Sequence, residues 1–425
     1  MATETTLPIL IVGAGISGLS LAQYLRKSGI PFRIFDRDAS IESRTGGWGL
    51  TFHWGLPALK ELLPDELYER LGECNVNPNA QDAGKYRFLD LKTGESLHAA
   101  TFPKTGRLRV IRSKLRTLLA TGVDIEWSKR AVDITTGPDS VTISFEDGST
   151  AEGWLLVASD GSNSRIRKYL YPSAFENIPV PVRLLGVTVS YSPEQVASAL
   201  AIDPYFFQGT HSDSNIYLFF SFLNSPYNTG NDTGNYICQV IVSWAESKDI
   251  KIPESNVERI ALIKNITSDW TPHLRRLIEI IPDDAEATAI HLADWFPTTK
   301  RELERVVLMG DAAHTMTMCE LIITGSGDFL LETNQNLLRI VRGEGGNNAV
   351  TDACDFAKRV GPLIEQKNQH QEVTWENFDQ ALHEYDRDVL TRGQTCVTNA
   401  RQACLDAHDF SLVTEESPLV SRRSK

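Results

Sequence analysis

The strongest indication of the fold is the segment Leu7-Pro-Ile-Leu-Ile-Val-Gly13-Ala-Gly15-Ile-Ser-Gly18. A short apolar run, typical of a buried parallel strand, ends at Val12, and glycines follow at the spacing GxGxxG. Gly13 permits a tight turn, Gly15 lets the backbone approach a pyrophosphate, and Gly18 lets the following helix pack on the strand. The N–H groups at the start of that helix are donors for an anion. The pattern predicts a βαβ dinucleotide-binding unit.

The residues after the glycines complete this unit. Apolar residues recur at helical spacing from Ile16 to Leu25, and Gly29 is a stop signal after the last turn. Phe32–Phe35 predicts a second strand, which ends in Asp36. A carboxylate at that position can accept hydrogen bonds from ribose hydroxyls. The motif alone does not separate FAD from NAD, and a glycine-rich turn without a ligand is the alternative.

The composition limits the classes of protein to which the chain can belong. Its 425 residues suffice for a large core and two domains with a tail. The net charge of −13 disfavours nucleic acid and anionic membranes as partners, because their phosphates would be repelled. The six cysteines form no CxxC pair, so no metal site or disulfide framework is predicted. No apolar run reaches the ~18 residues of a membrane span, and Met1–Thr6 lacks the basic start of a signal peptide. We therefore expect a cytoplasmic protein.

A different pattern begins near residue 178. Leu184–Tyr191, Ile216–Phe222 and Tyr236–Trp244 are rich in β-branched and aromatic residues and are separated by turn-forming residues. They predict a separate antiparallel sheet on which a substrate could lie. The polar or aromatic candidates for substrate contact or catalysis there are Arg183, Gln208, His211 and Tyr217. For each, the alternative is an ordinary packed or solvated residue of the sheet.

Two further motifs follow apolar strands. Leu155–Ala158 leads to Asp160-Gly161, and Arg305–Met309 leads to Gly310-Asp311. Each places an aspartate at the carboxyl end of a strand, where ligands bind in open α/β sheets. Taken singly, either aspartate could instead cap a helix or stabilise a turn. Helices are predicted near residues 55–75, over a basic segment within 105–120, and over 254–282.

Together, in this order and spacing, the motifs resemble the class A flavoprotein monooxygenases, the family of para-hydroxybenzoate hydroxylase and of fungal FAD-dependent hydroxylases of secondary metabolism. The resemblance spans about residues 7–395. It implies an α/β fold: a Rossmann-like FAD-binding domain, an antiparallel-sheet substrate domain and a helical C-terminal segment. It favours FAD over NAD as the cofactor. The residues that match the family's cofactor positions are Gly13, Gly15, Gly18, Asp36, Gly49, Arg112, Asp160, Asp311 and Gly346.

The resemblance also implies roles and boundaries. Asp36 would contact the adenosine ribose, Asp311 the ribityl chain, and Asp160 both FAD and the nicotinamide cofactor. The expected FAD-binding domain comprises 1–75, 100–175 and 290–365; the substrate domain 76–99 and 176–289; and C-terminal helices with a tail 366–425, of which the last dozen residues are expected to be disordered.

The implied reaction is a monooxygenation. NAD(P)H reduces FAD, O₂ gives a flavin C4a-hydroperoxide, and one oxygen passes to an aromatic, phenolic or polyketide-derived small molecule. Baeyer–Villiger oxidation or epoxidation would use the same peroxyflavin. His314 is expected to be a structural member of its motif rather than a general base. The substrate, the choice of NADH or NADPH, and the oligomeric state stay open.

The chain departs from the family after Gly310-Asp311. Residues 319–341 match nothing expected, and the pattern resumes at Gly343-Glu-Gly-Gly346, followed by a helix whose apolar face runs from Ala349 to Ile364. Removing 319–341 would restore the family spacing and place Gly346 beside the flavin. We therefore hypothesise an insertion, either a retained intron translated in frame, which would leave an inactive flavoprotein, or an excursion specific to this branch of the family.

Overall fold

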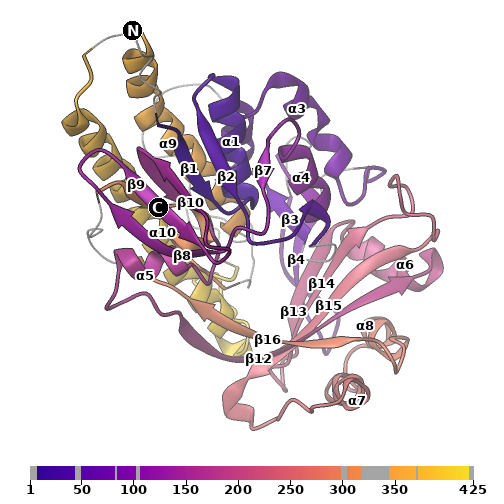
Figure 1. The fold of residues 1–425 in the computed structure, drawn as a ribbon. Coiled ribbons are helices and arrows are strands. Elements are labelled where there is room, and N and C mark those ends of the chain that lie inside the picture. Colours follow the sequence, from indigo (N-terminus) through magenta and orange to yellow (C-terminus); the bar gives the residue numbers. More distant parts are fainter. Residues whose placement is uncertain are drawn as a thin grey trace.

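The computed structural model describes residues 7–43, 49–81, 84–101, 106–297, 304–317, 344–369 and 372–420. The hypothesised insertion at 319–341 lies outside these residues, so it stays a hypothesis. Figure 1 shows two parts, a parallel sheet flanked by helices and a larger, strongly twisted sheet. The predicted α/β architecture, with a Rossmann-like unit, a second sheet and a helical C-terminal segment, is confirmed.

The βαβ unit lies in a five-stranded parallel sheet. Its strand order is β17 (Val306–Leu308), β11 (Leu155–Ala158), β1 (Ile9–Val12), β2 (Phe32–Phe35) and β7 (Ile125–Glu126). β1, β11 and β17 are buried along their whole length, as continuous apolar runs predict. Because the strands are parallel, their carboxyl ends, with the loops that follow them, lie at one edge of the sheet.

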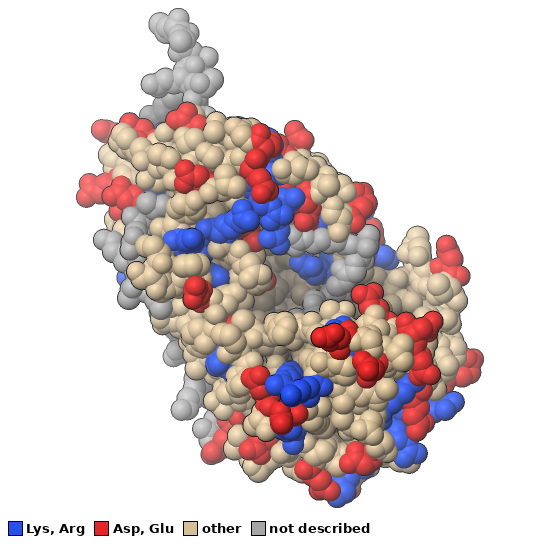
Figure 2. Space-filling view, turned by 60° about the horizontal axis from the view of Figure 1, so that its bottom comes forward, with Lys and Arg blue, Asp and Glu red and all other residues tan. Residues whose placement is uncertain are grey.

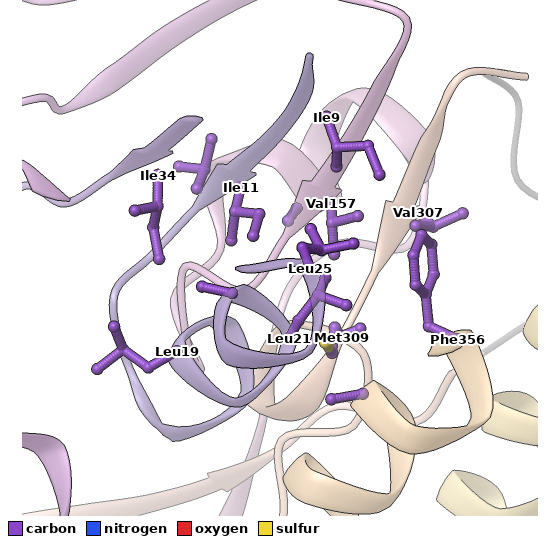
Figure 3. Close-up of a cluster of buried hydrophobic side chains, with 14 of the residues drawn as sticks. Ile9, Ile11, Leu19, Leu21, Leu25, Ile34, Val157, Val307, Met309 and Phe356 are labelled. Carbon is purple, nitrogen blue, oxygen red and sulfur yellow. The ribbon is translucent and has the colours of Figure 1, made fainter. Parts of the chain in front are cut away.

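Helices cover one face of this sheet. α1 (Ile16–Lys27) and α9 (Glu344–Asn368) pack side by side, and their apolar residues meet those of the strands (Figure 3). The helix face predicted from Ala349 to Ile364 is buried, which confirms that prediction. A three-stranded antiparallel sheet lies across the other face: β8 (Ala131–Thr136), β9 (Val141–Phe145) and β10 (Thr150–Gly153) (Figure 1).

The second sheet has seven strands. Their order is β16 (Ala287–Asp294), β12 (Ile178–Tyr191), β15 (Tyr236–Ala245), β14 (Tyr217–Asn224), β13 (Phe206–Thr210), β4 (Lys85–Asp90) and β5 (Ser96–Thr101). All neighbours pair antiparallel except β13 and β4, which pair parallel. One face packs against α6 (Pro193–Ile202), α7 (Asn256–Ile266) and α8 (Pro272–Glu279). The other face turns towards the parallel-sheet part and towards the end of α10 (Trp375–Asp406).

Several local predictions need correction. The segment predicted as helix near 55–75 is divided into α2 (Leu56–Leu62), α3 (Asp65–Glu69) and a 3₁₀ turn, because Pro64 separates the first two. The basic helix α4 is confined to Arg112–Leu119, and β6 (Leu108–Ile111) precedes it, paired with β3 (Gly49–Phe52). The helical prediction over 254–282 is interrupted between α7 and α8, where Pro272 starts a new helix.

The prediction of a disordered tail is wrong for its described part. Leu419 and Val420 are fully buried, in the same cluster as Cys404 and Ala407 of the C-terminal segment and Tyr217 of β14. Residues 421–425 lie outside the described part of the chain. No helix in the described part combines the length and the apolar character needed to cross a bilayer.

Candidate functional site

A cleft of about 580 Å³ lies between the two parts of the molecule. Figure 2 shows a hollow there, with basic side chains along the rim formed by the parallel-sheet part. The described residues that line it include, from the parallel-sheet part, Gly13, Gly15, Asp36, Gly49, Arg112, Asp160, Asp311 and Gly346. From the seven-stranded sheet they include Leu184, Tyr217, Phe219, Gln239, Ile241, Ile290 and Leu292. One continuous space therefore joins the GxGxxG loop to the second sheet.

The glycines of the first motif have different structural tasks. Gly13 has φ +108°, and a Cβ atom there would lie 2.2 Å from the carbonyl oxygen of Ser159. A Cβ at Gly18 would lie 2.1 Å from the carbonyl oxygen of Gly13, so both positions need glycine for packing. A Cβ at Gly15 would meet none of the described atoms within 4 Å. Gly15 lines the cleft above the first turn of α1, a place that suits a pyrophosphate.

Asp36 ends β2 at the same edge of the sheet. The residue is 4% exposed; its Oδ2 accepts from the backbone N–H of Ala14 at 2.7 Å and its Oδ1 from that of Asp38 at 2.9 Å. The guanidinium of Arg116 lies 3.5 Å from Oδ2. The carboxylate is thus held against the glycine loop, and the guanidinium of Arg116 balances its charge. Asp36 also lines the cleft.

Asp160 serves two functions that the sequence left as alternatives. Its Oδ2 accepts from the backbone N–H of Arg165 at 2.9 Å, at the start of α5 (Arg165–Leu170). Its buried Oδ1 has no hydrogen-bond partner among the described residues, and the residue lines the cleft. Burial raises the pKa of this carboxyl group, against the opposing hydrogen bond from Ser164. The side chain therefore braces a helix and also leaves an acceptor at the cleft.

The middle of the cleft brings together residues that are distant in sequence. Arg112 begins α4, Asp311 follows β17, Gly49 begins β3, and Gly346 lies in the first turn of α9. Burial raises the pKa of Asp311, although the charges of His314 and Arg112 act in the opposite direction. A Cβ at Gly346 would come within 3.3 Å of the Phe52 ring. Glycine at this position therefore allows close packing on Phe52, and Gly345 and Gly346 both line the cleft.

Asn347 joins β3 to α9 and was missed by the sequence reasoning. The side chain is fully buried; its Oδ1 accepts from the backbone N–H groups of His53 at 3.1 Å and Gly55 at 3.0 Å. Its Nδ2 donates to the carbonyl oxygen of Thr51 at 2.8 Å. Asparagine is a poor helix former whose side chain readily hydrogen-bonds to backbone groups. Its position directly after a glycine run was the sequence feature that could have identified Asn347.

A buried charge network stands behind the Gly-Asp motif. Oδ2 of Asp352 on α9 accepts from the backbone N–H of Gly310 at 2.8 Å and lies 2.7 Å from Nε2 of His314. Arg392 on α10 donates to Oδ1 of Asp352 and, at 2.6 Å, to Asp355. Burial alone would raise the pKa of Asp352, but His314 and Arg392 hold it below its usual range. Asp352 and Arg392 were not predicted as site residues.

His314 is fully buried within that network and lies outside the described lining of the cleft. Burial alone would lower the pKa of its imidazole, but the facing carboxylate of Asp352 raises it. The network therefore fixes the start of the Gly310-Asp311 turn through one histidine, one carboxylate and one guanidinium.

Of the substrate-side candidates, the structure brings only Tyr217 to the cleft lining. Its hydroxyl donates to Oε1 of Gln208, which is fully buried behind it. Arg183 points to the other side of the sheet, where it donates to the carbonyl oxygen of Ile250 at 2.7 Å. His211 is buried in a turn, and its Nδ1 accepts from the backbone N–H groups of Asp213 and Ser214.

The apolar residues that line this end were not singled out from the sequence. β14 reads YLFFSFLN and is buried almost throughout, so alternation could not show which side chains face the cleft. The register of β14 with β15 places Phe219 opposite Ile241, and both line the cleft.

Comparison with known proteins gives consistent matches. Residues 6–320 match the family model described as "FAD binding domain". A protein of Arthroderma benhamiae named "Probable FAD-dependent monooxygenase" is 36% identical over 441 residues, covering 99% of this chain and 96% of that protein. FAD-dependent monooxygenase dbaB of Emericella nidulans is 40% identical over 368 residues, covering 84% of this chain and 88% of its own. Klebsiella pneumoniae HpxO complexed with FAD and uric acid has the same fold, with TM-score 0.71 at 19% identity over 96% of this chain and 91% of that one.

Proposed function

Because this chain belongs to the family of FAD-dependent monooxygenases, we propose that it uses NAD(P)H and O₂ to hydroxylate an aromatic, phenolic or polyketide-derived small molecule in secondary-metabolite biosynthesis. The observation that carries the proposal is the single cleft that joins the GxGxxG loop to the apolar face of the seven-stranded sheet. A monooxygenase needs its cofactor and its substrate in one enclosed space, because the transferred oxygen must not be lost to water.

The described residues fit FAD. The open space above Gly15 and the N–H groups that begin α1 suit the pyrophosphate, and in this proposal Asp36, which lines the cleft, accepts hydrogen bonds from the adenosine ribose. In this proposal Arg112 and Asp311 contact the middle of the cofactor, and Gly49 and Gly346 border its ring. FAD, when bound, supplies the redox chemistry, accepting a hydride from NAD(P)H and activating O₂.

The chain's own contribution is binding, orientation and electrostatics. The first turn of α9 carries glycines at the cleft, so its backbone N–H groups can face negative charge that develops on a bound ring. The network of Asp352, His314 and Arg392 holds the Gly310-Asp311 turn in place. The apolar side chains of the second sheet exclude water from the position of the substrate.

Purified full-length protein tests this proposal directly. We expect a yellow protein from which denaturation releases FAD, and oxidation of NADPH or NADH that aromatic compounds stimulate. Under ¹⁸O₂, one labelled oxygen should enter the product, and mass spectrometry of that product also separates hydroxylation from Baeyer–Villiger oxidation or epoxidation. FAD-containing protein that oxidises the aromatic compound without incorporating label would be a dehydrogenase instead.

A second candidate is a flavoprotein inactivated by an insertion at 319–341. The observation in its favour is that Thr317, before this segment, and Gly345, after it, both line the cleft. The segment therefore interrupts the chain at the cofactor site, unlike a loop at a tolerant surface tip. Sequencing the spliced transcript and comparing FAD content of the full-length and 319–341-deleted proteins decide between the two. Colourless full-length protein that binds FAD only after the deletion would establish inactivation.

A further inference from the structure

One polar side chain interrupts the apolar face of the seven-stranded sheet inside the cleft. Gln239 on β15 lines the cleft and is only 8% exposed. Its buried Oε1 has no hydrogen-bond partner among the described residues. The hydroxyl of Tyr217, which also lines the cleft from this sheet, already donates to Gln208. Buried polar groups are almost always hydrogen-bonded, so we expect Oε1 of Gln239 to accept a hydrogen bond from a group outside the described residues.

The sheet geometry directs this amide into the cleft. Successive residues of a strand point to opposite faces. Cys238 and Val240 belong to the core that the α6–α8 side of the sheet covers, whereas Gln239 and Ile241 line the cleft. Across the ladder, Gln239 lies opposite Ser221 on β14 and Thr188 on β12.

The residues of the seven-stranded sheet that line the cleft around this amide are mostly apolar and carry no formal charge. The described residues of the seven-stranded sheet that line the cleft are Leu184, Tyr217, Phe219, Gln239, Ile241, Ile290, His291, Leu292 and Ala293. No lysine, arginine, aspartate or glutamate is among them. A carboxylate buried on this surface would lose its hydration, which is costly, and the sheet itself supplies no guanidinium or ammonium group to face it. The guanidinium of Arg109, 6.0 Å from the centre of the Phe219 ring, already donates to the carbonyl oxygen of Phe222 and to Oγ1 of Thr51. A neutral hydroxyl needs only one hydrogen-bond partner.

We propose that Gln239 determines substrate specificity by accepting a hydrogen bond from a hydroxyl of a neutral, planar aromatic substrate, whose ring packs on Phe219 and Ile241. This inference rests on the proposed function and narrows it, from aromatic molecules in general to uncharged phenols. The same side chain would discriminate against aromatic ethers, which cannot donate to Oε1, and against aromatic carboxylates, which find no counter-charge on this face.

Three naphthalene probes test the assignment on full-length, FAD-loaded protein. 2-Naphthol carries the hydroxyl, 2-methoxynaphthalene lacks the donor, and 2-naphthoate carries a charge. Binding is measured as the perturbation of the flavin absorbance spectrum. We expect 2-naphthol to bind about tenfold more tightly than 2-methoxynaphthalene, the ratio typical of one hydrogen bond, and 2-naphthoate to bind most weakly.

Substitutions test whether the preference for 2-naphthol over 2-methoxynaphthalene arises at Gln239. In Gln239→Leu the ratio of the two dissociation constants should fall to about one, because only the phenol loses a partner. Thr188→Val, on the neighbouring strand and exposed, should leave the ratio unchanged. Ser221→Ala is the stricter control, since Oγ of Ser221 is also buried without a partner among the described residues. If Ser221→Ala removed the preference as well, the amide would act through Ser221 and the assignment would be overturned.

The remaining outcomes are also decisive. A tenfold preference that persists in Gln239→Leu, or tighter binding of 2-naphthoate than of 2-naphthol, overturns the inference. FAD content and melting temperature show whether the variant folds, and Gln239→Met repeats the test with an unbranched side chain of similar length. Wild-type protein that binds FAD and oxidises NADPH but responds to none of the probes refutes this inference alone. Protein that binds no FAD refutes the proposed function and this inference together.

Discussion

The two ends of the cleft differ in what lines them: closely packed backbone at the parallel-sheet end, and apolar side chains at the seven-stranded end. At the parallel-sheet end, backbone contacts dictate residue identity, since a Cβ at Gly13 or Gly18 would lie 2.2 Å or 2.1 Å from a carbonyl oxygen. At the seven-stranded end, Phe219, Ile241 and Ile290 supply apolar surface that other apolar residues could also supply. Residue identity is therefore tightly constrained at the first end, whereas the second end tolerates exchange among apolar residues of similar size.

The largest effect is expected behind the parallel-sheet end, in the buried network. Asp352→Asn leaves Arg392 and His314 facing a neutral amide, and breaking a buried charge pair costs about 3–5 kcal/mol. One of the two acceptor oxygens also becomes an amide donor, which weakens the anchoring of the Gly310-Asp311 turn, so FAD content should fall with stability. Denaturant unfolding and flavin absorbance measure both. Asp355→Asn is the control: Asp355 pairs only with Arg392 in this network and its side chain is 24% exposed, so its loss should cost far less.

The next largest effect is expected from substitutions in the glycine loop, which distinguish a glycine needed for packing from one needed for FAD binding. Gly13→Ala forces a side chain into φ +108° against Ser159 and should destabilise the fold by about 3 kcal/mol. Gly15→Ala meets none of the described atoms within 4 Å, so stability should be kept while FAD affinity falls, because the new methyl group occupies the proposed pyrophosphate space. Equal loss of stability in both variants would contradict this division of tasks.

The same contrast explains how much of the structure was predictable. The βαβ unit and the buried face of α9 were predicted because their signals are local: glycines at short spacing, and apolar residues at helical period. Asn347 and the pair of Asp352 with Arg392 were missed because such contacts join residues far apart in sequence, 40 positions in the second case. No periodicity encodes a partner at that distance.

At the substrate end, prediction failed for a different physical reason. Helices cover one face of the seven-stranded sheet and the cleft lies on the other, so β14 is apolar on both faces and its alternation is hidden. Candidates for substrate contact could then be chosen only by the polar character of their side chains. This criterion selected Arg183, which is hydrogen-bonded on the opposite face of the sheet, and His211, whose Nδ1 is hydrogen-bonded within a turn. It did not select Gln239. The tail was misjudged similarly, since Leu419 and Val420 are too short a run to show a pattern.

A smaller effect is expected from the apolar surface itself. Phe219→Leu keeps the residue apolar and should cost at most about 1.5 kcal/mol of stability. FAD content should stay unchanged, while the affinity for 2-naphthol falls about threefold to tenfold through the lost aromatic contact. Phe220→Leu is the matched control, because Phe220 lies on the opposite face, stacked on Phe207 at 5.1 Å. It should lower stability and leave 2-naphthol affinity unchanged; a loss of affinity there would mean that the whole sheet, rather than its cleft face, governs binding.

The smallest effect is the pH dependence of stability that His314 should contribute. Because Asp352 raises the pKa of His314 above its ordinary 6.5, the protonated imidazole stabilises the folded state. This contribution is fully present below pH 6.5 and is lost as the pH rises through the higher folded-state value. Melting temperatures of wild type and His314→Asn, compared between pH 6 and 9, should therefore converge as the pH rises. A constant difference would mean that His314 acts through packing alone, and that the charge balance behind the Gly310-Asp311 turn depends on Arg392.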